Sequence, residues 1–340
     1  MLDEFSNQVI KTDFSKIYGQ SELKHDLKSA LLARRHVIIV GPPGAGKTTI
    51  AKNVADLMPK RVLNDCNFHC DPKNPVCPEC KTKSMETKEF EGDDLFIRVQ
   101  GSPDLTAEDL LGDIDPIKAL KYGPLSVEAF TPGKIFRANN GILFFDEVNR
   151  CSEKLQNAML QVLQEKKVTI GSYEFDFDAD FIFIGTMNPE DESTETLSHV
   201  FLDIFDLIYM NYPKKITTEM NIVKTYGNKL GVEFPVKLLH HTVEFVRELR
   251  DDKDLEKHPG VRASIGLYER AQSNAILRGS EKVSYEDIHK AVQSVISHRI
   301  KLKPSVKYLT SPTDYIKEKF ETYAKVNDMS NSENEEGDAP

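Results

Sequence analysis

The sequence predicts an α/β core, with a mostly parallel sheet of five strands covered by helices on both faces, followed by a separate helical domain. Short β-rich apolar runs alternate with helical stretches as far as Pro213, and the β-rich runs stop beyond it. A length of 340 residues allows two domains at ~100 to 200 residues each. We therefore divide the chain into a core over 1–213, with a cysteine-rich insertion at 64–94, a helical domain over 214–305, and a C-terminal segment over 306–340.

The strands of the core are expected where β-branched and aromatic residues run together. The first is His36–Val40, which leads into a glycine-rich loop and then a helical stretch over 49–58. A polar stretch with periodic apolar residues, from Asp13 to Leu32, precedes this strand. Further strands are expected over 95–99, 141–145 and 181–185.

Helical periodicity dominates the second part of the chain. We expect helices over 217–230, 236–250, 261–278 and 285–300. Ser284 and Asp287 stand three residues apart at the start of the last one, which favours a capped beginning. The C-terminal segment should contain a helix and then, from Asn327, an acidic disordered tail without function.

Composition narrows the classes of partner and compartment. The chain has 44 basic and 54 acidic residues, a net charge of −10, which disfavours nucleic acid as the default partner. Acids stand near the N-terminus where a signal peptide carries bases, and no apolar run approaches the ~18 residues of a membrane span. We expect a cytoplasmic protein without a membrane partner.

A phosphate-binding loop lies between the first strand and its helix. Glycines there allow backbone N–H groups to turn toward phosphate oxygens, and the start of the helix adds its positive dipole end. Lys47 would neutralise the β and γ charge of ATP, and Thr48 would ligate Mg²⁺. The predicted nucleotide-binding residues are Gly41, Pro42, Pro43, Gly44, Ala45, Gly46, Lys47, Thr48 and Thr49.

Two adjacent carboxylates follow the strand expected at 141–145. Asp146 is predicted to hold Mg²⁺ and Glu147 to polarise the attacking water as general base. Asn188 ends the next strand and would touch the γ-phosphate or that water, although an Asn before a Pro is also an ordinary turn signal.

Four of the five cysteines fall within fifteen residues of the insertion, at Cys66, Cys70, Cys77 and Cys80. We interpret them as four thiolate ligands of a structural Zn²⁺, because a metal can close a small loop that has no core of its own. His69 as a substitute ligand, an iron–sulfur cluster on the same thiolates, and free thiols in a surface loop remain the alternatives.

Three further stretches of the chain are distinctive: Gly112-Asp113-Ile114-Asp115 with Ala119-Leu120, Phe130-x-Pro132-Gly133 with Arg137-Ala138-Asn139, and Asp146-Glu147-Val148-Asn149-Arg150 with Gln156-Asn157-Ala158-Met159-Leu160. With them the chain resembles a known family, the AAA+ ATPases of the MoxR and magnesium-chelatase I-subunit group, from Gly19 to Arg299. The first two stretches look more like the chelatase subunit, and the form Asp-Glu-Val-Asn-Arg looks more like MoxR.

The resemblance implies an AAA+ core with a helical lid. It implies that Lys47 and Thr48 are the Walker A residues and that Asp146 and Glu147 form Walker B. Asn188 would be sensor 1, and Arg262 would be sensor 2, reaching the γ-phosphate from the lid. Without it, Arg262 would be read as a surface arginine at a helix start. Members of the group are similar in forming rings, usually hexameric, and in working with a partner that bears a von Willebrand factor A domain.

Two hairpins of this clade would correspond to 125–133 and 168–177, and both usually face the ring pore or a substrate. An ordinary β-hairpin is the alternative for the second, which has two short strand-like runs around a glycine.

One departure concerns catalysis. Where the group usually has Leu-Asp-Arg-Phe, this chain has isoleucine at position 204, so the arginine that enters a neighbouring site is absent. Arg150 is the best internal replacement, although it also fits an arginine that caps a local acid. A partner could supply the arginine, or turnover could be slow.

The resemblance thus favours a ring ATPase that remodels a protein partner, with metal insertion as one task that it implies. The alternatives are a nucleic-acid motor, disfavoured by the acidic charge, and a nucleotide-dependent scaffold that hydrolyses poorly.

Overall fold

A computed structural model describes residues 3–123, 126–165, 167–169, 176–178, 180–189 and 197–329. These residues form two compact units, which are described separately. The first comprises Met1–Pro42 and Gly46–Met210, and the second comprises Pro43–Ala45 and Asn211–Pro340. The chain therefore changes unit at Met210, close to the predicted end of the core at 213.

The first unit is built on a sheet of five strands in the order β11-β1-β10-β7-β4, and all four pairings are parallel. The apolar runs of β1, β7 and β10 are buried, as expected of strands covered on both faces. The strands predicted at 95–99, 141–145 and 181–185 are present with bounds shifted by one or two residues. The strands of this sheet are β1 (His36–Val40), β4 (Phe96–Gln100), β7 (Ile142–Asp146), β10 (Ile182–Met187) and β11 (Phe205–Tyr209).

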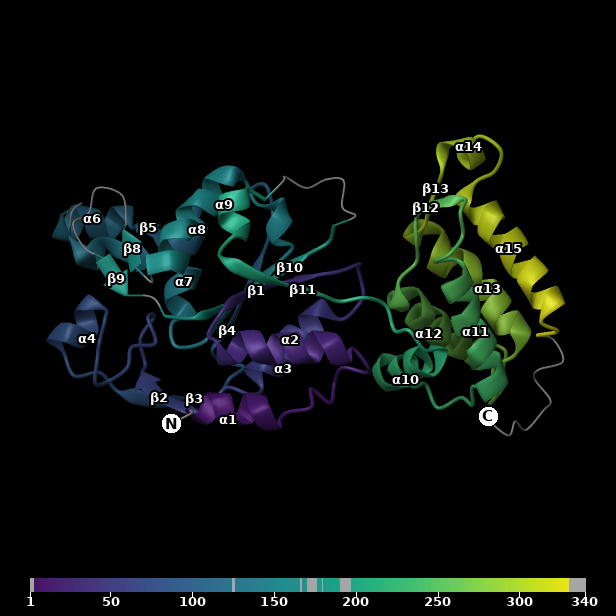
Figure 1. Cartoon of the computed structure of the whole chain (residues 1–340), viewed down its shortest axis with the longest axis horizontal. Coiled ribbons are helices and arrows are strands. Elements are labelled where there is room, and N and C mark those ends of the chain that lie inside the picture. Colours follow the sequence, from purple (N-terminus) through teal and green to yellow (C-terminus); the bar gives the residue numbers. More distant parts are fainter. Residues whose placement is uncertain are drawn as a thin grey trace. The chain divides into compact units, whose positions relative to one another are not determined.

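Helices cover both faces of this sheet (Figure 1). On one face lie α1 (Glu4–Lys11), α2 (Ser21–Leu32) and α3 (Lys47–Ala55). On the other lie α7 (Lys134–Arg137), α8 (Glu153–Glu165) and α9 (His199–Leu202). Leu143 and Phe145, two residues apart on β7, share a hydrophobic cluster with Leu155 and Met159 of α8, because alternate side chains of a strand point to the same face.

Smaller elements surround the sheet. In the cysteine-rich insertion, β2 (Arg61–Asn64) pairs antiparallel with β3 (Thr87–Phe90), and α4 (Pro78–Thr82) lies between them. In the predicted 125–133 hairpin region, β6 (Phe130–Pro132) pairs with β5 (Gly112–Ile114), while Leu125 lies outside the described residues. The pair β8 (Lys167–Thr169) and β9 (Asp176–Asp178) supplies the strands of the 168–177 hairpin, whose turn is also outside them. The remaining elements are α5 (Ala107–Leu111), α6 (Pro116–Tyr122), η1 (Val127–Ala129) and η2 (Val148–Arg150).

The second unit is helical, as predicted. Its helices begin within one residue of the predicted positions, and the capping box of Ser284 and Asp287 at the start of α13 is confirmed. The helix predicted over 285–300 ends at Ile296 and continues as η3 (Ser297–Arg299). The elements are α10 (Ile216–Tyr226), α11 (Val236–Glu248), β12 (Leu255–Lys257), α12 (Val261–Leu277), α13 (Tyr285–Ile296), β13 (Lys301–Leu302), α14 (Pro304–Lys307) and α15 (Pro312–Val326).

The C-terminal helix α15 belongs to the core of this second unit. Ile316 and Phe320 are buried in one cluster with residues of α11, α12 and α13. Asn327 is the C-cap of α15 and Met329 is fully buried, so the chain is ordered past the predicted start of the tail. Residues 330–340 lie outside the described part.

A buried carboxylate ties three helices of the second unit together. Glu219 on α10 is fully buried, and both its oxygens accept from Arg250 at 2.6 and 2.8 Å. Arg247 of α11 donates to it at 3.2 Å, and Ser264 in the first turns of α12 donates at 2.8 Å. The start of α12, which carries Arg262, is therefore fixed to α10 and α11.

Among the described residues, no helix is long and apolar enough to cross a membrane.

Candidate functional site

The phosphate loop follows the buried strand β1 and ends where α3 begins at Lys47. Gly46, the N-cap of α3, has φ of 106°, a left-handed conformation that glycine adopts without strain. No side chain caps the helix start, so its backbone N–H groups are not taken up by a capping residue. Residues from Pro42 to Thr49 are half-buried, and the Lys47 ammonium donates to the carbonyls of Gly41 (2.6 Å) and Pro42 (2.9 Å).

The two predicted Walker B carboxylates stand at the carboxyl end of β7. Asp146 Oδ1 accepts a hydrogen bond from the Thr186 hydroxyl at 2.7 Å, and the backbone N–H of Glu147 donates to the same hydroxyl oxygen at 2.9 Å. Glu147 itself has φ of 56°, an uncommon left-handed conformation for a residue with a side chain. Thr186 of the neighbouring strand β10 thus holds the Asp146 carboxylate and the Glu147 backbone in place.

The sequence analysis missed two polar residues of β4 at this edge. The Arg98 guanidinium contacts Asp146 Oδ2 at 2.6 Å, and Gln100 Nε2 donates to Glu147 Oε2 at 3.0 Å. Arg98 also donates to the Gln100 amide oxygen at 3.2 Å. The sequence did contain a sign of these contacts. Arg98 and Gln100 are two polar residues, two positions apart, in an otherwise apolar strand whose carboxyl end lies beside that of β7.

Gly101 explains how the chain leaves β4 so close to these carboxylates. A Cβ added there would lie 2.1 Å from the Glu147 carbonyl oxygen, and its N–H donates to the Asp146 carbonyl at 2.7 Å. No side chain fits in that space, so a larger residue would displace the backbone that carries both carboxylates.

Asn188 follows β10 at the same edge of the sheet and is half-buried. Its carbonyl accepts from Asn149 Nδ2 at 3.2 Å, which links the end of β10 to the turn after Glu147. The Asn149 Oδ1 atom is buried and has no hydrogen-bond partner among the described residues.

The three remaining predicted positions differ in what surrounds them. Arg150 contacts Glu147 Oε2 of its own chain, with Nε at 3.3 Å and the arginine side chain 36% exposed. Ile204 is half-buried and packs against the hydrophobic core of the first unit. Arg262 is exposed on α12 of the second unit, to which Pro43–Ala45 of the phosphate loop also belong. Its side chain lies beside that loop, because a Cβ added at Gly44 would be 3.2 Å from Arg262 Cγ.

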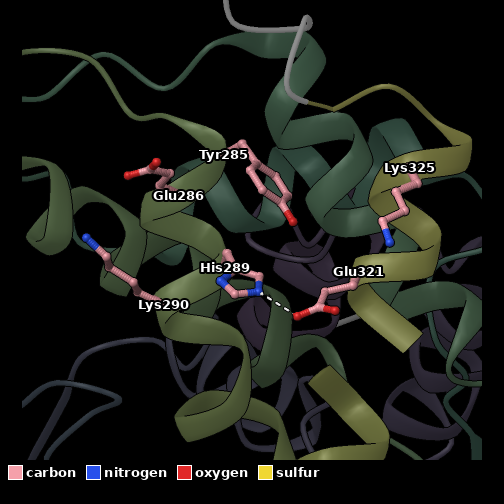
Figure 2. A pocket seen from close by; sticks show the side chains of 6 residues that line it. All are labelled: Tyr285, Glu286, His289, Lys290, Glu321 and Lys325. Atoms are coloured by element: carbon pink, nitrogen blue, oxygen red, sulfur yellow. Dashed lines mark hydrogen bonds and ion pairs between the residues drawn. The ribbon is translucent and has the colours of Figure 1, made fainter. Parts of the chain in front are cut away.

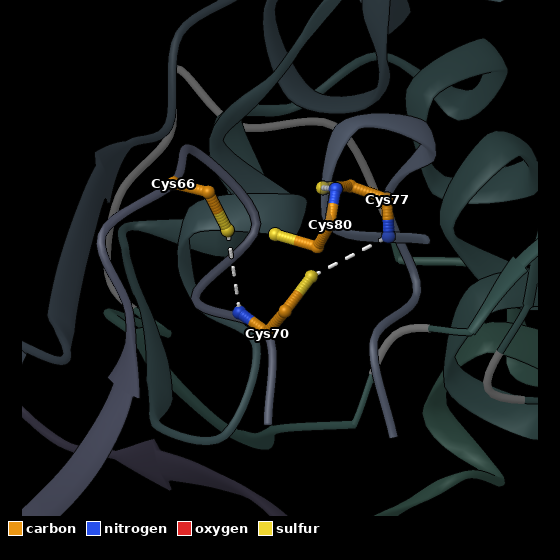
Figure 3. A group of neighbouring side chains, drawn as sticks. All are labelled: Cys66, Cys70, Cys77 and Cys80. Atoms are coloured by element: carbon orange, nitrogen blue, oxygen red, sulfur yellow. Dashed lines mark hydrogen bonds between the residues drawn. The ribbon is translucent and has the colours of Figure 1, made fainter. Parts of the chain in front are cut away.

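The four cysteines of the insertion converge, with their Sγ atoms all within 4.8 Å of one another (Figure 3). Cys70, Cys77 and Cys80 are buried and Cys66 is half-buried. A hydrogen bond between the Cys66 and Cys70 side chains lowers the pKa of Cys66 to about 5. It also raises the pKa of Cys70. His69 is not part of this converging group, and its Nδ1 lies 2.7 Å from the Arg137 carbonyl oxygen.

The second unit also carries a surface pocket of about 510 Å³ between α13 and α15 (Figure 2). Its residues are Tyr285, Glu286, His289, Lys290, Glu321 and Lys325. His289 Nε2 and Glu321 Oε1 approach to 3.4 Å across it. None of the predicted site residues lines this pocket.

Three models of known families match parts of this chain. The family model described as "ATPase family associated with various cellular activities (AAA)" matches residues 76–207. The model described as "Magnesium chelatase, subunit ChlI" matches 13–89, and the "AAA lid domain" model matches 257–317.

Individual relatives match over most of the chain. The magnesium-chelatase subunit ChlI homolog of Methanocaldococcus jannaschii is 26% identical over 91% of this chain and 89% of its own length. The magnesium-chelatase 38 kDa subunit of Acidiphilium rubrum is 26% identical over 86% of this chain and 91% of its own. A chain of the BchI and BchD complex of magnesium chelatase shares the fold, with a TM-score of 0.50 and 20% identity over 87% of this chain and 98% of that one.

Proposed function

We propose that this chain, which belongs to the AAA+ ATPases of the magnesium-chelatase I-subunit group, binds Mg-ATP and hydrolyses it to drive remodelling of a protein partner. The observation that carries the proposal is the edge formed by β1, β7 and β10. The phosphate loop follows β1, the two carboxylates stand at the end of β7, and Asn188 follows β10. In parallel α/β sheets, ligands bind at the carboxyl ends of the strands.

Each residue at this edge has a role that its chemistry supports. Lys47 would leave the carbonyls of its own loop to neutralise phosphate, and Thr48 with Asp146 would hold Mg²⁺. Glu147 would accept the proton of the attacking water, with Gln100 orienting its carboxylate. Asn188 would contact the γ-phosphate as sensor 1, and Arg262 would do so from the lid as sensor 2. When bound, Mg²⁺ supplies charge stabilisation at the phosphates.

The assembly is proposed to be a ring, most simply a hexamer, that works with a partner bearing a von Willebrand factor A domain. The shared fold with a subunit of the BchI and BchD complex supports a protein partner, and insertion of a metal is the finer possibility that follows from the chelatase relatives. A structural Zn²⁺ in the insertion is the third proposed cofactor, beside ATP and Mg²⁺.

The second candidate function is a nucleic-acid motor, and the net charge of −10 argues against it.

The test measures equilibrium binding of Mg-ATP and phosphate release by the purified chain. We expect Lys47→Ala to abolish binding and Glu147→Gln to retain binding while turnover falls about 10²- to 10⁴-fold. Lys52→Ala, an exposed lysine on the same helix α3, and Glu153→Gln, an exposed acid on α8, are the matched controls. Unchanged turnover in Glu147→Gln would remove Glu147 as the base, and no nucleotide binding by the wild type would overturn the proposal.

A further inference from the structure

The cysteine-rich insertion brings two pairs of thiols face to face (Figure 3). Cys66 and Cys70 come from the turn after β2, and Cys77 and Cys80 come from the start of α4. We propose that these four cysteines bind one Zn²⁺, and that the loop closed by this metal braces the amino ends of β7 and β10. The proposal goes beyond nucleotide binding, because none of its ligands belongs to the phosphate loop or to the carboxylate edge.

The spacing of the sulfurs fits a single ion. Zn–S bonds of ~2.3 Å in a tetrahedron place sulfurs roughly 3.8 Å apart. The four Sγ atoms already lie within 4.8 Å of one another, so small rotations of the side chains complete the tetrahedron. In an iron–sulfur cluster the four cysteines are divided among two or four irons, so they spread further apart than around a single ion, which disfavours that alternative.

Backbone N–H groups already point at the sulfurs. The N–H of Cys70 donates to Cys66 Sγ at 3.5 Å, that of Cys77 to Cys70 Sγ at 3.4 Å, and that of Cys80 to Cys77 Sγ at 3.3 Å. Such donors stabilise negative charge on sulfur, and the thiolate is the form that binds metal. Free thiols in a surface loop would need neither this convergence nor the burial of three of the four side chains.

The loop between Cys66 and Cys70 contacts a corner of the core. The carbonyls of Phe68 and His69 accept from the side-chain amides of Asn139 (3.0 Å) and Asn140 (2.9 Å). The Phe68 ring packs on Phe136 with centroids 4.9 Å apart. The peptide between Cys66 and Cys70 is therefore held on one side by the thiols and on the other by the residues that lead into β7.

The same two asparagines also hold the entry to β10. The N–H of Asp180 donates to Asn139 Oδ1 at 2.9 Å, and the Asn140 N–H donates to the Asp180 carbonyl at 2.7 Å. Ile142 and Ile182, the first residues of β7 and β10, are paired directly beyond this corner. Closing the cysteine loop therefore fixes both strands at the ends opposite Asp146 and Asn188.

Metal content is measured first, on the full chain prepared without chelator. We expect one zinc per chain by elemental analysis, and its loss in Cys70→Ser and Cys80→Ser. The matched control is Cys151→Ser, a buried cysteine outside the cluster, which should keep the zinc. Neither zinc nor iron in the wild type would overturn the site, and one iron per chain would overturn zinc as its metal.

The bracing is tested separately by amide hydrogen exchange on the wild-type chain before and after zinc is removed with a chelator, so no variant has to fold. We expect faster exchange at 139–142 and 180–182 as well as in 65–86, and unchanged exchange in α13 of the second unit. Faster exchange confined to 65–86 would show a metal site that does not brace the strands. Nucleotide binding measured on the same samples distinguishes either failure from failure of the ATPase proposal.

Discussion

Glu219 in the helical unit and Asp146 in the first unit are both paired with arginine, and their surroundings are opposite. Glu219 in the helical unit is fully buried, and Arg250, Arg247 and Ser264 use both of its oxygens. Asp146 at the sheet edge is 15% exposed, and its arginine partner, Arg98, is 52% exposed. The first pairing fixes helices in place, while the second joins groups that water and a metal ion can reach.

The difference shows that an ion pair has to be interpreted from its burial as well as from its distance, since both pairs have a contact of 2.6 Å. Exposed pairs contribute ~0 to 1 kcal/mol because solvent screens them. Removing one partner of a buried pair costs about 3–5 kcal/mol, because a charge is left without compensation. We therefore expect Glu219 to govern stability and the edge carboxylates to govern turnover.

The largest effect is expected from an arginine that reaches a neighbouring subunit, because the ion pairs of Glu219 and Asp146 are both formed within one chain. If turnover is slow because position 204 is isoleucine and not arginine, Ile204→Arg should raise turnover by up to ~10³- to 10⁵-fold in the assembled protein. The measurement is phosphate release per subunit over a range of protein concentrations, since an effect between subunits requires assembly.

Arg150→Ala serves as the comparison, because Arg150 contacts Glu147 of its own chain in this structure. Fast, concentration-dependent turnover by the wild type, unaffected by Arg150→Ala, would contradict both slow turnover and Arg150 as the replacement.

Glu219→Ala tests the buried side of the comparison. We expect the free energy of unfolding of the helical unit to fall by about 3–5 kcal/mol, because two guanidinium groups lose their anion. Denaturant unfolding followed by circular dichroism measures it. Arg250→Ala should cost more than Arg247→Ala, since Arg250 is 10% exposed and Arg247 26%. Equal, small effects for all three variants would show that burial does not separate the two regions.

Arg98→Ala tests the exposed side and should have the smallest effect on folding, ~0 to 1 kcal/mol. Because the guanidinium and Mg²⁺ compete for Asp146, we expect the Mg²⁺ concentration for half-maximal ATP binding to fall. Titration of nucleotide binding with Mg²⁺ measures this. Arg35→Ala removes another exposed ion pair of the same unit, with Asp206 at 3.1 Å, and should leave the Mg²⁺ dependence unchanged. A raised Mg²⁺ requirement in Arg98→Ala would mean that the arginine assists binding.

Much of the fold was predictable because its signals are local. The strand, loop and helix around Lys47 and the helices of the second unit follow from apolar periodicity and capping residues. The strand β11 was not assigned, because it lies at the sheet edge with Leu207 and Tyr209 exposed, and Asp206 interrupts the apolar run that marks the buried strands of the same length.

The contacts at the site depend on information that no single segment holds. Arg98 and Gln100 reach the carboxylates because β4 and β7 are parallel in a register that sets Gln100 beside Asp146. That register follows from packing of the whole sheet. The four cysteines could be grouped by spacing alone, whereas their neighbours Asn139 and Asn140 come from a distant stretch of the chain.

The ladder of β2 and β3 has a consequence for how this protein can change over generations. Asn64 pairs with Thr87, so the chain enters and leaves the cysteine-rich insertion at neighbouring points. The entropic cost of closing a loop grows only slowly with its length, so the stability of the β2–β3 pairing depends little on the number of residues between the two strands. The segment between Asn64 and Thr87 can therefore change in length without moving the two ends of the ladder, whereas Phe68 and His69 within it are constrained by their contacts with Phe136, Asn139 and Asn140.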